Sequence, residues 1–232
     1  MQGDMDLNKS ALCLIDIQKE SKFGIENIDS VVENSKHLIE QCRKLNIPVI
    51  YTRHINRADG IGLSNNDPLD SSGKPIFYCT GTEAIEVIDE IAPKEEDVVI
   101  DKFRWSGFYE TSLDIILKSL KVKHLMIGGL VTDGCLMTSV FDGYFRDYEI
   151  NLIKDICATS NEGAHMAATL IMANWVYGIK IYDSSELIKK LQGKDYYVWE
   201  SEGPDQLQFT PENMREVYGK LNQDANLIKQ KS

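Results

Sequence analysis

The stretch Gly128–Phe145, GGLVTDGCLMTSVFDGYF, decides the fold of this chain. A mostly apolar run, His124–Ile127, precedes it and is typical of a buried strand. Two glycines interrupt that strand, and Thr132 and Asp133 behind them are both favoured helix N-cap residues. The sequence therefore predicts a strand, a tight turn and a helix in direct succession. The apolar residues of the predicted helix recur at helical spacing, at Leu136, Val140, Phe141 and Tyr144.

Cys135 falls in the first turn of the predicted helix. Backbone N–H groups without intrahelical partners and the positive end of the helix dipole favour a thiolate at such a position. The same N–H groups can hold a developing oxyanion. This position suits a nucleophile, although a small apolar filler is the alternative, because buried cysteines are common.

The composition is that of a globular protein with an acidic surface. The 232 residues are 43% hydrophobic and 26% charged, with a formal net charge of -11. The length allows one large α/β domain or two small ones. The acidity argues against a nucleic-acid partner or an anionic membrane, because either would need a basic patch. A small-molecule substrate, even an anionic one, is compatible with it.

Cysteine usage and the N-terminal residues indicate a cytoplasmic protein. The five cysteines are scattered, odd in number and form no CxxC pair, so neither a disulfide framework nor a zinc site is predicted. The first ten residues, MQGDMDLNKS, lack the basic and apolar regions of a signal peptide. No apolar run reaches membrane-spanning length.

Apolar runs alternate with helical patterns along the chain. This alternation predicts an α/β fold, a three-layer α/β/α arrangement with a six-stranded parallel sheet in the order 3-2-1-4-5-6. The predicted strands are 11–17, 47–52, 98–100, 124–127, 149–153 and 178–182. The predicted helices are 29–45, 82–91, 111–120, a helix from 136, 161–175 and 184–191.

Residues 1–192 are predicted to form one domain, and residues 193–232 a C-terminal extension that packs on it or on a neighbouring subunit. In the extension, Thr210-Pro211 is predicted to open a helix, since Pro suits the first helical turn. A long loop, residues 56–81, is rich in Asp, Asn, Ser, Gly and Pro. Loops of this length in a compact domain are usually functional.

Three ionisable residues follow predicted strands: Asp16 after the first, Lys102 after the third and Cys135 after the fourth. Ligands bind beyond the carboxyl ends of strands in open parallel sheets. Asp16 alone could equally cap a loop or pair with a basic residue. Together the three supply an acid/base, a cation and a thiol, the set that covalent amide hydrolysis needs.

These residues stand in motifs that are similar to those of the isochorismatase-like cysteine hydrolases, which include nicotinamidases and N-carbamoylsarcosine amidase. The resemblance covers about residues 8–192. Its motifs are Asp16-Ile17-Gln18, Lys102 with Ser106-Gly107-Phe108 and Thr111, Gly129-Leu130-Val131-Thr132-Asp133-Gly134-Cys135, and Asp155 with His165.

The resemblance implies a triad of Asp16, Lys102 and Cys135. Asp16 would take the thiol proton, Lys102 would stabilise the thiolate, and the sulfur of Cys135 would attack an amide or ureido carbonyl. The backbone N–H groups of Val131 and Cys135 would hold the oxyanion. The family pattern also implies a cis peptide bond between Leu130 and Val131.

The sequence departs from two branches of the family. Nicotinamidases carry Asp-x-His after the second strand and further histidines that bind a divalent metal, whereas this chain reads Tyr51-Thr52-Arg53-His54 and has four histidines in all. We therefore expect no metal and no cofactor. Isochorismatases proper lack the cysteine, so Cys135 favours amide chemistry.

Four residues are predicted to contact the substrate: Gln18, Arg53, Trp105 and Phe108. Arg53 ends the second strand, where its forked guanidinium could face a substrate carboxylate or carbonyl, with His54 and Arg57 as further candidates. Trp105 and Phe108 belong to an aromatic run that is either a pocket wall or core. His165 is expected to fix a loop near Asp155.

The function predicted is that of a cysteine amidohydrolase for a small amide or N-carbamoyl compound, working through a thioester as a homodimer or homotetramer. Two alternatives stay open. One is a nicotinamidase-type amidase. The other is a non-catalytic thiol sensor on the same fold, in which Cys135 is oxidised rather than acylated.

Overall fold

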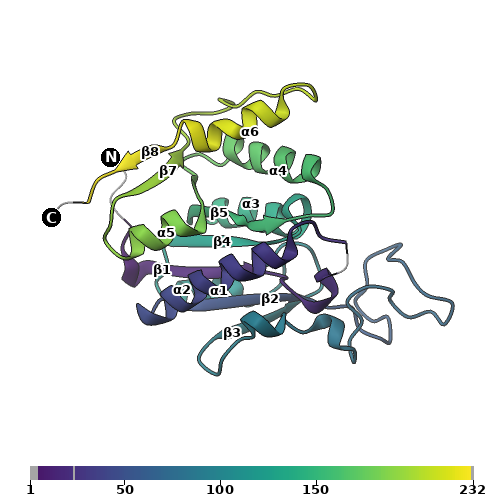
Figure 1. The fold of residues 1–232 in the computed structure, drawn as a ribbon. Helices are drawn as coiled ribbons and strands as arrows, with labels where there is room; N and C mark the ends of the chain where they lie inside the picture. The colour runs from purple at the N-terminus through teal and green to yellow at the C-terminus, as the bar shows by residue number, and fades with distance from the viewer. Residues whose placement is uncertain (1–4, 23, 231–232) are drawn as a thin grey trace.

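A computed structural model describes residues 5–22 and 24–230. These residues form one eight-stranded sheet in the order β3-β2-β1-β4-β5-β6-β7-β8 (Figure 1). The pairs from β3 to β6 are parallel, and β7 and β8 add to that edge antiparallel. The predicted parallel order 3-2-1-4-5-6 is confirmed. The strands are β1 (Ser10–Ile15), β2 (Val49–His54), β3 (Val98–Lys102), β4 (His124–Leu130), β5 (Glu149–Ala158), β6 (Lys180–Tyr182), β7 (Tyr196–Glu200) and β8 (Asn226–Ile228).

Helices cover both faces of the sheet, because the central strands are apolar on both sides. In β1, Leu12 and Leu14 join the core under α1 and α5, while Cys13 and Ile15 join the core under α2, α3 and α4. Figure 1 shows α1 and α5 lying across the near face. The helices are α1 (Ile28–Lys44), α2 (Leu113–Ser119), α3 (Met137–Tyr144), α4 (Glu162–Trp175), α5 (Ser184–Leu191) and α6 (Met214–Gln223).

The predicted helix over residues 82–91 is wrong. The segment holds two separate 3-10 turns, Glu83–Ile85 and Asp89–Ile91. Between them the backbone bonds to the segment that follows β1, since Lys19 N–H donates to Glu86 O at 2.8 Å. This pairing uses the backbone groups that a continuous helix would need.

Several element ends differ from the sequence prediction, and two of the differences have a clear cause. Strand β5 continues to Ala158, because it pairs with β4 again after a bulge that lies between Ile127 and Gly129. Helix α6 begins at Met214 rather than at Thr210-Pro211, because the Asn213 side chain accepts a bond from Thr210 N–H and holds that segment in a turn.

The segment after residue 192 continues the sheet with β7 and β8, which the sequence analysis did not predict. Its helix α6 packs on α4, and the exposed ion pair between Arg215 and Glu162 joins the two helices. Buried residues of α6, Val217 and Leu221, extend the core on that face.

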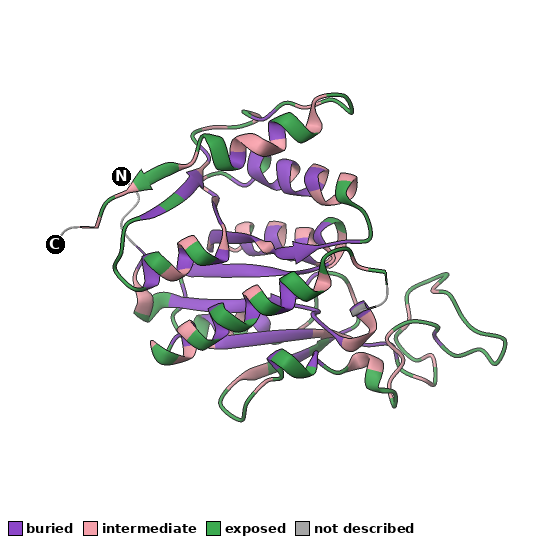
Figure 2. Cartoon of the chain, viewed as in Figure 1, coloured by how far each residue is buried: buried purple, intermediate pink, exposed green. Residues whose placement is uncertain are grey.

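The long loop between β2 and the first 3-10 turn projects from one end of the molecule, and most of its residues are exposed (Figure 2). Two backbone bonds tie its base together: Asn56 N–H donates to Tyr78 O, and Thr80 N–H donates to Asn56 O, both at 2.8 Å. No helix in the described part of the chain is long and apolar enough to cross a membrane.

Candidate active site

Asp16 follows the last residue of β1, in a left-handed backbone conformation with φ of 50°. Its carboxylate is 3% exposed and has two partners. Oδ1 accepts a hydrogen bond from Thr52 Oγ1 at 2.7 Å, and Oδ2 lies 2.6 Å from Lys102 Nζ. The two partners come from β2 and β3, so three neighbouring strands fix the orientation of this carboxylate.

Lys102 ends β3, and its side chain is fully buried. Nζ also donates to Arg104 O at 2.9 Å. Burial lowers the pKa of the Lys102 ammonium, but the charges of Asp16 and Cys135 outweigh it, and the pKa is raised overall. The buried ammonium therefore keeps its proton beside the carboxylate.

Cys135 lies in a π-helical turn, Thr132–Leu136, between β4 and α3. Its sulfur lies close enough to Asp16 and Lys102 for both side chains to shift the pKa of its thiol. Burial, with the Asp16 charge second, raises the pKa of the Cys135 thiol to about 12, against the opposing effect of Lys102. The stabilising effect of the helix N-terminus on a thiolate is thus outweighed, because burial and the neighbouring carboxylate both disfavour a negative charge on the sulfur.

The turn that carries Cys135 is held tightly. The Leu130–Val131 peptide bond is cis, as the resemblance implied. Gly134 N–H and Leu136 N–H both donate to Val131 O, at 3.0 and 3.2 Å. Ser139 Oγ donates to Cys135 O at 2.6 Å. These bonds hold the thiol and the N–H groups of the turn in one geometry.

Gly129 lets this turn approach the end of β1. It has φ of 131°, and a Cβ on it would lie 2.1 Å from Ile15 O. Only glycine fits such a contact and such a backbone angle. The close approach of β4 to β1 brings Cys135 beside Asp16.

Asp16 and Cys135 line a cavity of about 380 Å³, and Lys102 is paired with Asp16 without itself lining the cavity. Its floor includes Asp16 and Cys135, and much of its wall comes from the long loop. The sequence analysis recognised that loop as functional by its length but identified none of its residues as wall residues. The lining residues are Asp16, His54, Asn56, Asp67, Pro68, Phe77, Tyr78, Trp105, Leu130, Val131, Asp133, Gly134 and Cys135.

Comparison with known proteins identifies the family of this chain. Residues 10–181 match the sequence profile of the isochorismatase domain. The chain belongs to the isochorismatase family. It is a hydrolase of that family with an α/β fold, and its relatives include amidohydrolases.

Two curated relatives are each 28% identical in sequence to this protein. One is an uncharacterised isochorismatase family protein, YaaI, from Bacillus subtilis, aligned over 185 residues, 78% of this chain and 97% of the relative. The other is the ureidoacrylate amidohydrolase RutB from Acinetobacter baylyi, aligned over 172 residues, 64% of this chain and 70% of the relative.

Two solved structures share its fold. The N-carbamoylsarcosine amidase from Thermoplasma acidophilum has 27% identity and a TM-score of 0.63, covering 77% of this chain and 98% of the amidase. A cysteine hydrolase from Pseudomonas syringae has 24% identity and a TM-score of 0.73, covering 82% of this chain and 96% of that one.

Of the four predicted substrate-contact residues, Trp105 lies on the cavity wall and is 64% exposed. The other three are not among the residues that line the cavity. The Gln18 amide is fully buried and donates to His54 O and Ile85 O at 2.9 and 2.8 Å, so it clamps β2 to the 3-10 turns. Phe108 is 3% exposed and stacks on Tyr148 in the core.

Arg53 points to two carboxylates. Its guanidinium forms a forked pair with Asp101, at 2.8 and 3.1 Å, and a further bond with Glu86 at 2.7 Å. Arg57 pairs with Asp59 within the loop. Neither arginine lines the cavity.

His54 does line the cavity. Its Nδ1 is buried and has no hydrogen-bond partner among the described residues. Burial, followed by the Lys102 charge, lowers the pKa of His54, so its imidazole is neutral near pH 7. An unpaired nitrogen on the wall of the cavity makes His54 a candidate for hydrogen bonding to a ligand.

Asp155 and His165 lie away from this cavity. The Asp155 carboxylate accepts bonds from Ser184 N–H and Ser184 Oγ at the start of α5. His165 Nδ1 lies 2.9 Å from Oγ1 of Thr132, in the turn that carries Cys135. Within residues 5–22 and 24–230, no group of three or more His, Cys, Asp or Glu side chains is placed to hold a metal ion.

Proposed function

We propose that this isochorismatase-family hydrolase is a cysteine amidohydrolase that cleaves the C–N bond of a small amide or N-carbamoyl compound through a thioester. The observation that carries the proposal is that Asp16 and Cys135 line one cavity while Asp16 is paired with the buried ammonium of Lys102. The names of two relatives, a ureidoacrylate amidohydrolase and an N-carbamoylsarcosine amidase, support the reaction class.

The first step is attack by the Cys135 sulfur on the substrate carbonyl. Since burial keeps the thiol protonated, Asp16 takes the thiol proton as the C–S bond forms. Lys102 then balances the charge near the sulfur while the proton resides on Asp16. The carbonyl oxygen becomes an oxyanion, and the N–H groups of Val131 and Cys135 are the proposed donors to it.

The second half of the cycle releases the acyl group. The tetrahedral adduct collapses, the C–N bond breaks, and Asp16 returns its proton to the departing amine. Asp16 then accepts a proton from water while the water oxygen attacks the thioester. When the C–S bond breaks, that proton passes to the sulfur, and the acid and the free enzyme are restored.

The charges on the cavity wall favour an uncharged or cationic substrate. The described lining residues include the carboxylates of Asp16, Asp67 and Asp133 and no Lys or Arg side chain. Arg53, the residue predicted to bind a substrate carboxylate, is instead occupied by Asp101 and Glu86. A substrate carboxylate would therefore meet the carboxylates of Asp67 and Asp133 without a lining cation to offset them.

An ammonia-release screen tests the proposal. The panel contains small amides and ureido compounds, each in uncharged and carboxylate forms, and the variants are Cys135→Ala and, as a control at a buried thiol outside the cavity, Cys157→Ala. We expect turnover by the parent protein and by Cys157→Ala and none by Cys135→Ala. Equal turnover by Cys135→Ala would rule out the thioester mechanism.

A further inference from the structure

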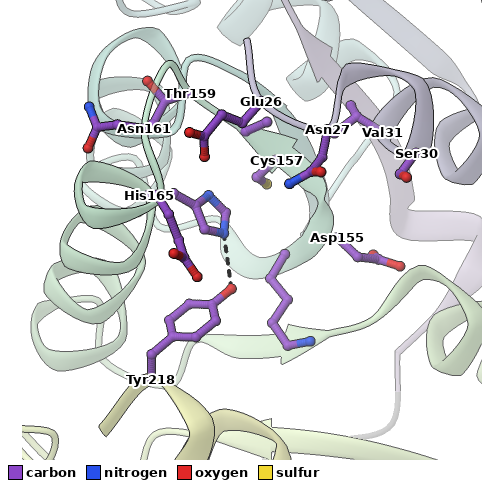
Figure 3. Close-up of a pocket in the computed structure, with 13 residues that line it drawn as sticks. Glu26, Asn27, Ser30, Val31, Asp155, Cys157, Thr159, Asn161, His165 and Tyr218 are labelled. Carbon is purple, nitrogen blue, oxygen red and sulfur yellow. Dashed lines mark hydrogen bonds between the residues drawn. The ribbon is translucent and has the colours of Figure 1, made fainter. Parts of the chain in front are cut away.

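A second hollow, of about 200 Å³, is lined by residues of α1, β5, α4 and α6 (Figure 3). His165 of α4 and Tyr218 of α6 face each other across it, and a hydrogen bond of 3.0 Å joins His165 Nε2 to Tyr218 Oη. The two rings also meet edge to face, with centroids 5.7 Å apart.

The other nitrogen of His165 reaches the catalytic turn. Nδ1 lies 2.9 Å from Oγ1 of Thr132, which is fully buried. Thr132 is the first residue of the turn and directly follows Val131, whose N–H is a proposed oxyanion donor. We call this series of three side chains the Thr132–His165–Tyr218 chain.

The Thr132–His165–Tyr218 chain connects a part of the protein that matches the family profile with a part that lies outside that match. Thr132 and His165 lie within residues 10–181, which match the family profile, whereas Tyr218 lies outside that match. Through His165, Tyr218 therefore links the C-terminal segment to a turn that lies within the family match.

We propose that the C-terminal segment positions the nucleophile of this enzyme, with Tyr218 acting as a positioning residue through His165 on the turn that carries Cys135. The proposal rests on the proposed function, because it assigns a role in that reaction.

The hydrogen bonding of the chain supports a positioning role. Burial lowers the pKa of His165, so the neutral ring has one N–H and one acceptor nitrogen. Each nitrogen then faces one hydroxyl, and hydroxyls can serve as either donor or acceptor. Removal of the Tyr218 hydroxyl leaves Nε2 without its partner, and the ring loses one of the two contacts that fix it against Thr132.

The other end of the turn is fixed independently. Ser139 and Thr138 donate to the carbonyl of Cys135 at 2.6 and 3.1 Å. The Thr132–His165–Tyr218 chain therefore controls the N-terminal end of the turn, where Val131 lies, and leaves the C-terminal end in place.

The test compares Tyr218→Phe with Arg215→Ala. Both change α6 where it contacts α4, but Arg215 pairs with Glu162 on the surface and has no part in the chain. For Tyr218→Phe we expect kcat to fall roughly fivefold, the equivalent of one lost hydrogen bond in the transition state, with KM within about twofold. Arg215→Ala should keep the parental kcat and KM.

A second measurement needs no substrate, so it separates failure of this inference from failure of the proposed function. Burial is the first cause of the raised pKa of the Cys135 thiol, and a loosened turn exposes the sulfur. Tyr218→Phe should therefore be alkylated at Cys135 by iodoacetamide several-fold faster at pH 8 than the parent protein, as read by peptide mass spectrometry.

Two results would overturn the inference. One is an alkylation rate and a kcat in Tyr218→Phe that equal those of the parent protein. The other is the same change in Arg215→Ala, since it would show that any weakening of the α4–α6 contact has this effect. Cys79, which is partly exposed and forms no contact with Thr132, His165 or Tyr218 among the hydrogen bonds described, serves as the internal reference for alkylation.

Discussion

Lys102 Nζ lies 2.6 Å from Asp16 Oδ2, and the two side chains are 0% and 3% exposed. A buried ammonium and a buried carboxylate at this distance depend on each other, because either one alone would be an uncompensated charge in the interior. The pair brings together the ends of β1 and β3, which are not adjacent in the sheet, and the Cys135 sulfur completes the group.

Lys102→Met should destabilise the protein as well as abolish turnover. Loss of one partner from a buried ion pair typically costs about 3–5 kcal/mol of unfolding free energy. Urea denaturation measures this cost. Asp16→Asn combined with Lys102→Met should be less destabilised than Lys102→Met alone, because the double variant leaves no buried charge. A Lys102→Met variant with the parental unfolding midpoint would contradict the coupling.

Gly129→Ala should prevent the close approach of β4 to β1. The added Cβ would lie 2.1 Å from Ile15 O at φ of 131°, and we expect a loss of more than about 4 kcal/mol or failure to fold. Gly81→Ala is the matched control, since it has φ of 86° and no atom within 4 Å of the new Cβ. The control should lose only about 1–2 kcal/mol from backbone strain. Equal unfolding midpoints for the two variants would show that the contact does not matter.

The thiol of the free protein should react slowly at neutral pH. Because the pKa of Cys135 is raised to about 12, chiefly by burial, its thiolate fraction should still increase with pH beyond 9. Iodoacetamide alkylation of Cys135, followed by peptide mass spectrometry from pH 6 to 10, should give a rate that rises throughout. A plateau below pH 8 would indicate a preformed thiolate and would favour the thiol-sensor alternative.

Uncharged substrates should be preferred over their carboxylate counterparts. We expect a ratio of kcat/KM of at least roughly tenfold, equivalent to about 1.4 kcal/mol. Asp67→Asn should reduce that ratio, because it removes a carboxylate from the wall. Glu95→Gln makes the same change of charge at an exposed site remote from the cavity and should leave the ratio unchanged. A parent enzyme that prefers the carboxylate forms would contradict the role assigned to the acidic wall.

The parallel sheet with helices on both faces, and the side chains that follow its strands, were predictable from sequence. Apolar runs alternate with helical periodicity, and the carboxyl ends of parallel strands meet at one edge, which places Asp16, Lys102 and Cys135 together. The false helix over residues 82–91 had helix-like spacing of apolar residues, but its backbone bonds to a distant segment.

The cavity wall and the C-terminal strands were not predictable in the same way. Phe77 and Tyr78 reach the cavity only because the loop folds back on Asn56. Phe108 and Trp105 are three residues apart in one aromatic run, yet Phe108 lies in the core and Trp105 on the cavity wall. Strand β7 forms by antiparallel pairing with β6, and no local pattern in the sequence specifies that partner.

The most direct test of the account is mass spectrometry of the Cys135 peptide, quenched in acid during turnover of an amide that the screen identifies. The account predicts an added mass equal to the acyl group on Cys135, which appears during turnover and disappears when the substrate is exhausted. Sustained ammonia release by Cys135→Ala, with no acyl mass on Cys135 of the parent enzyme, would contradict it.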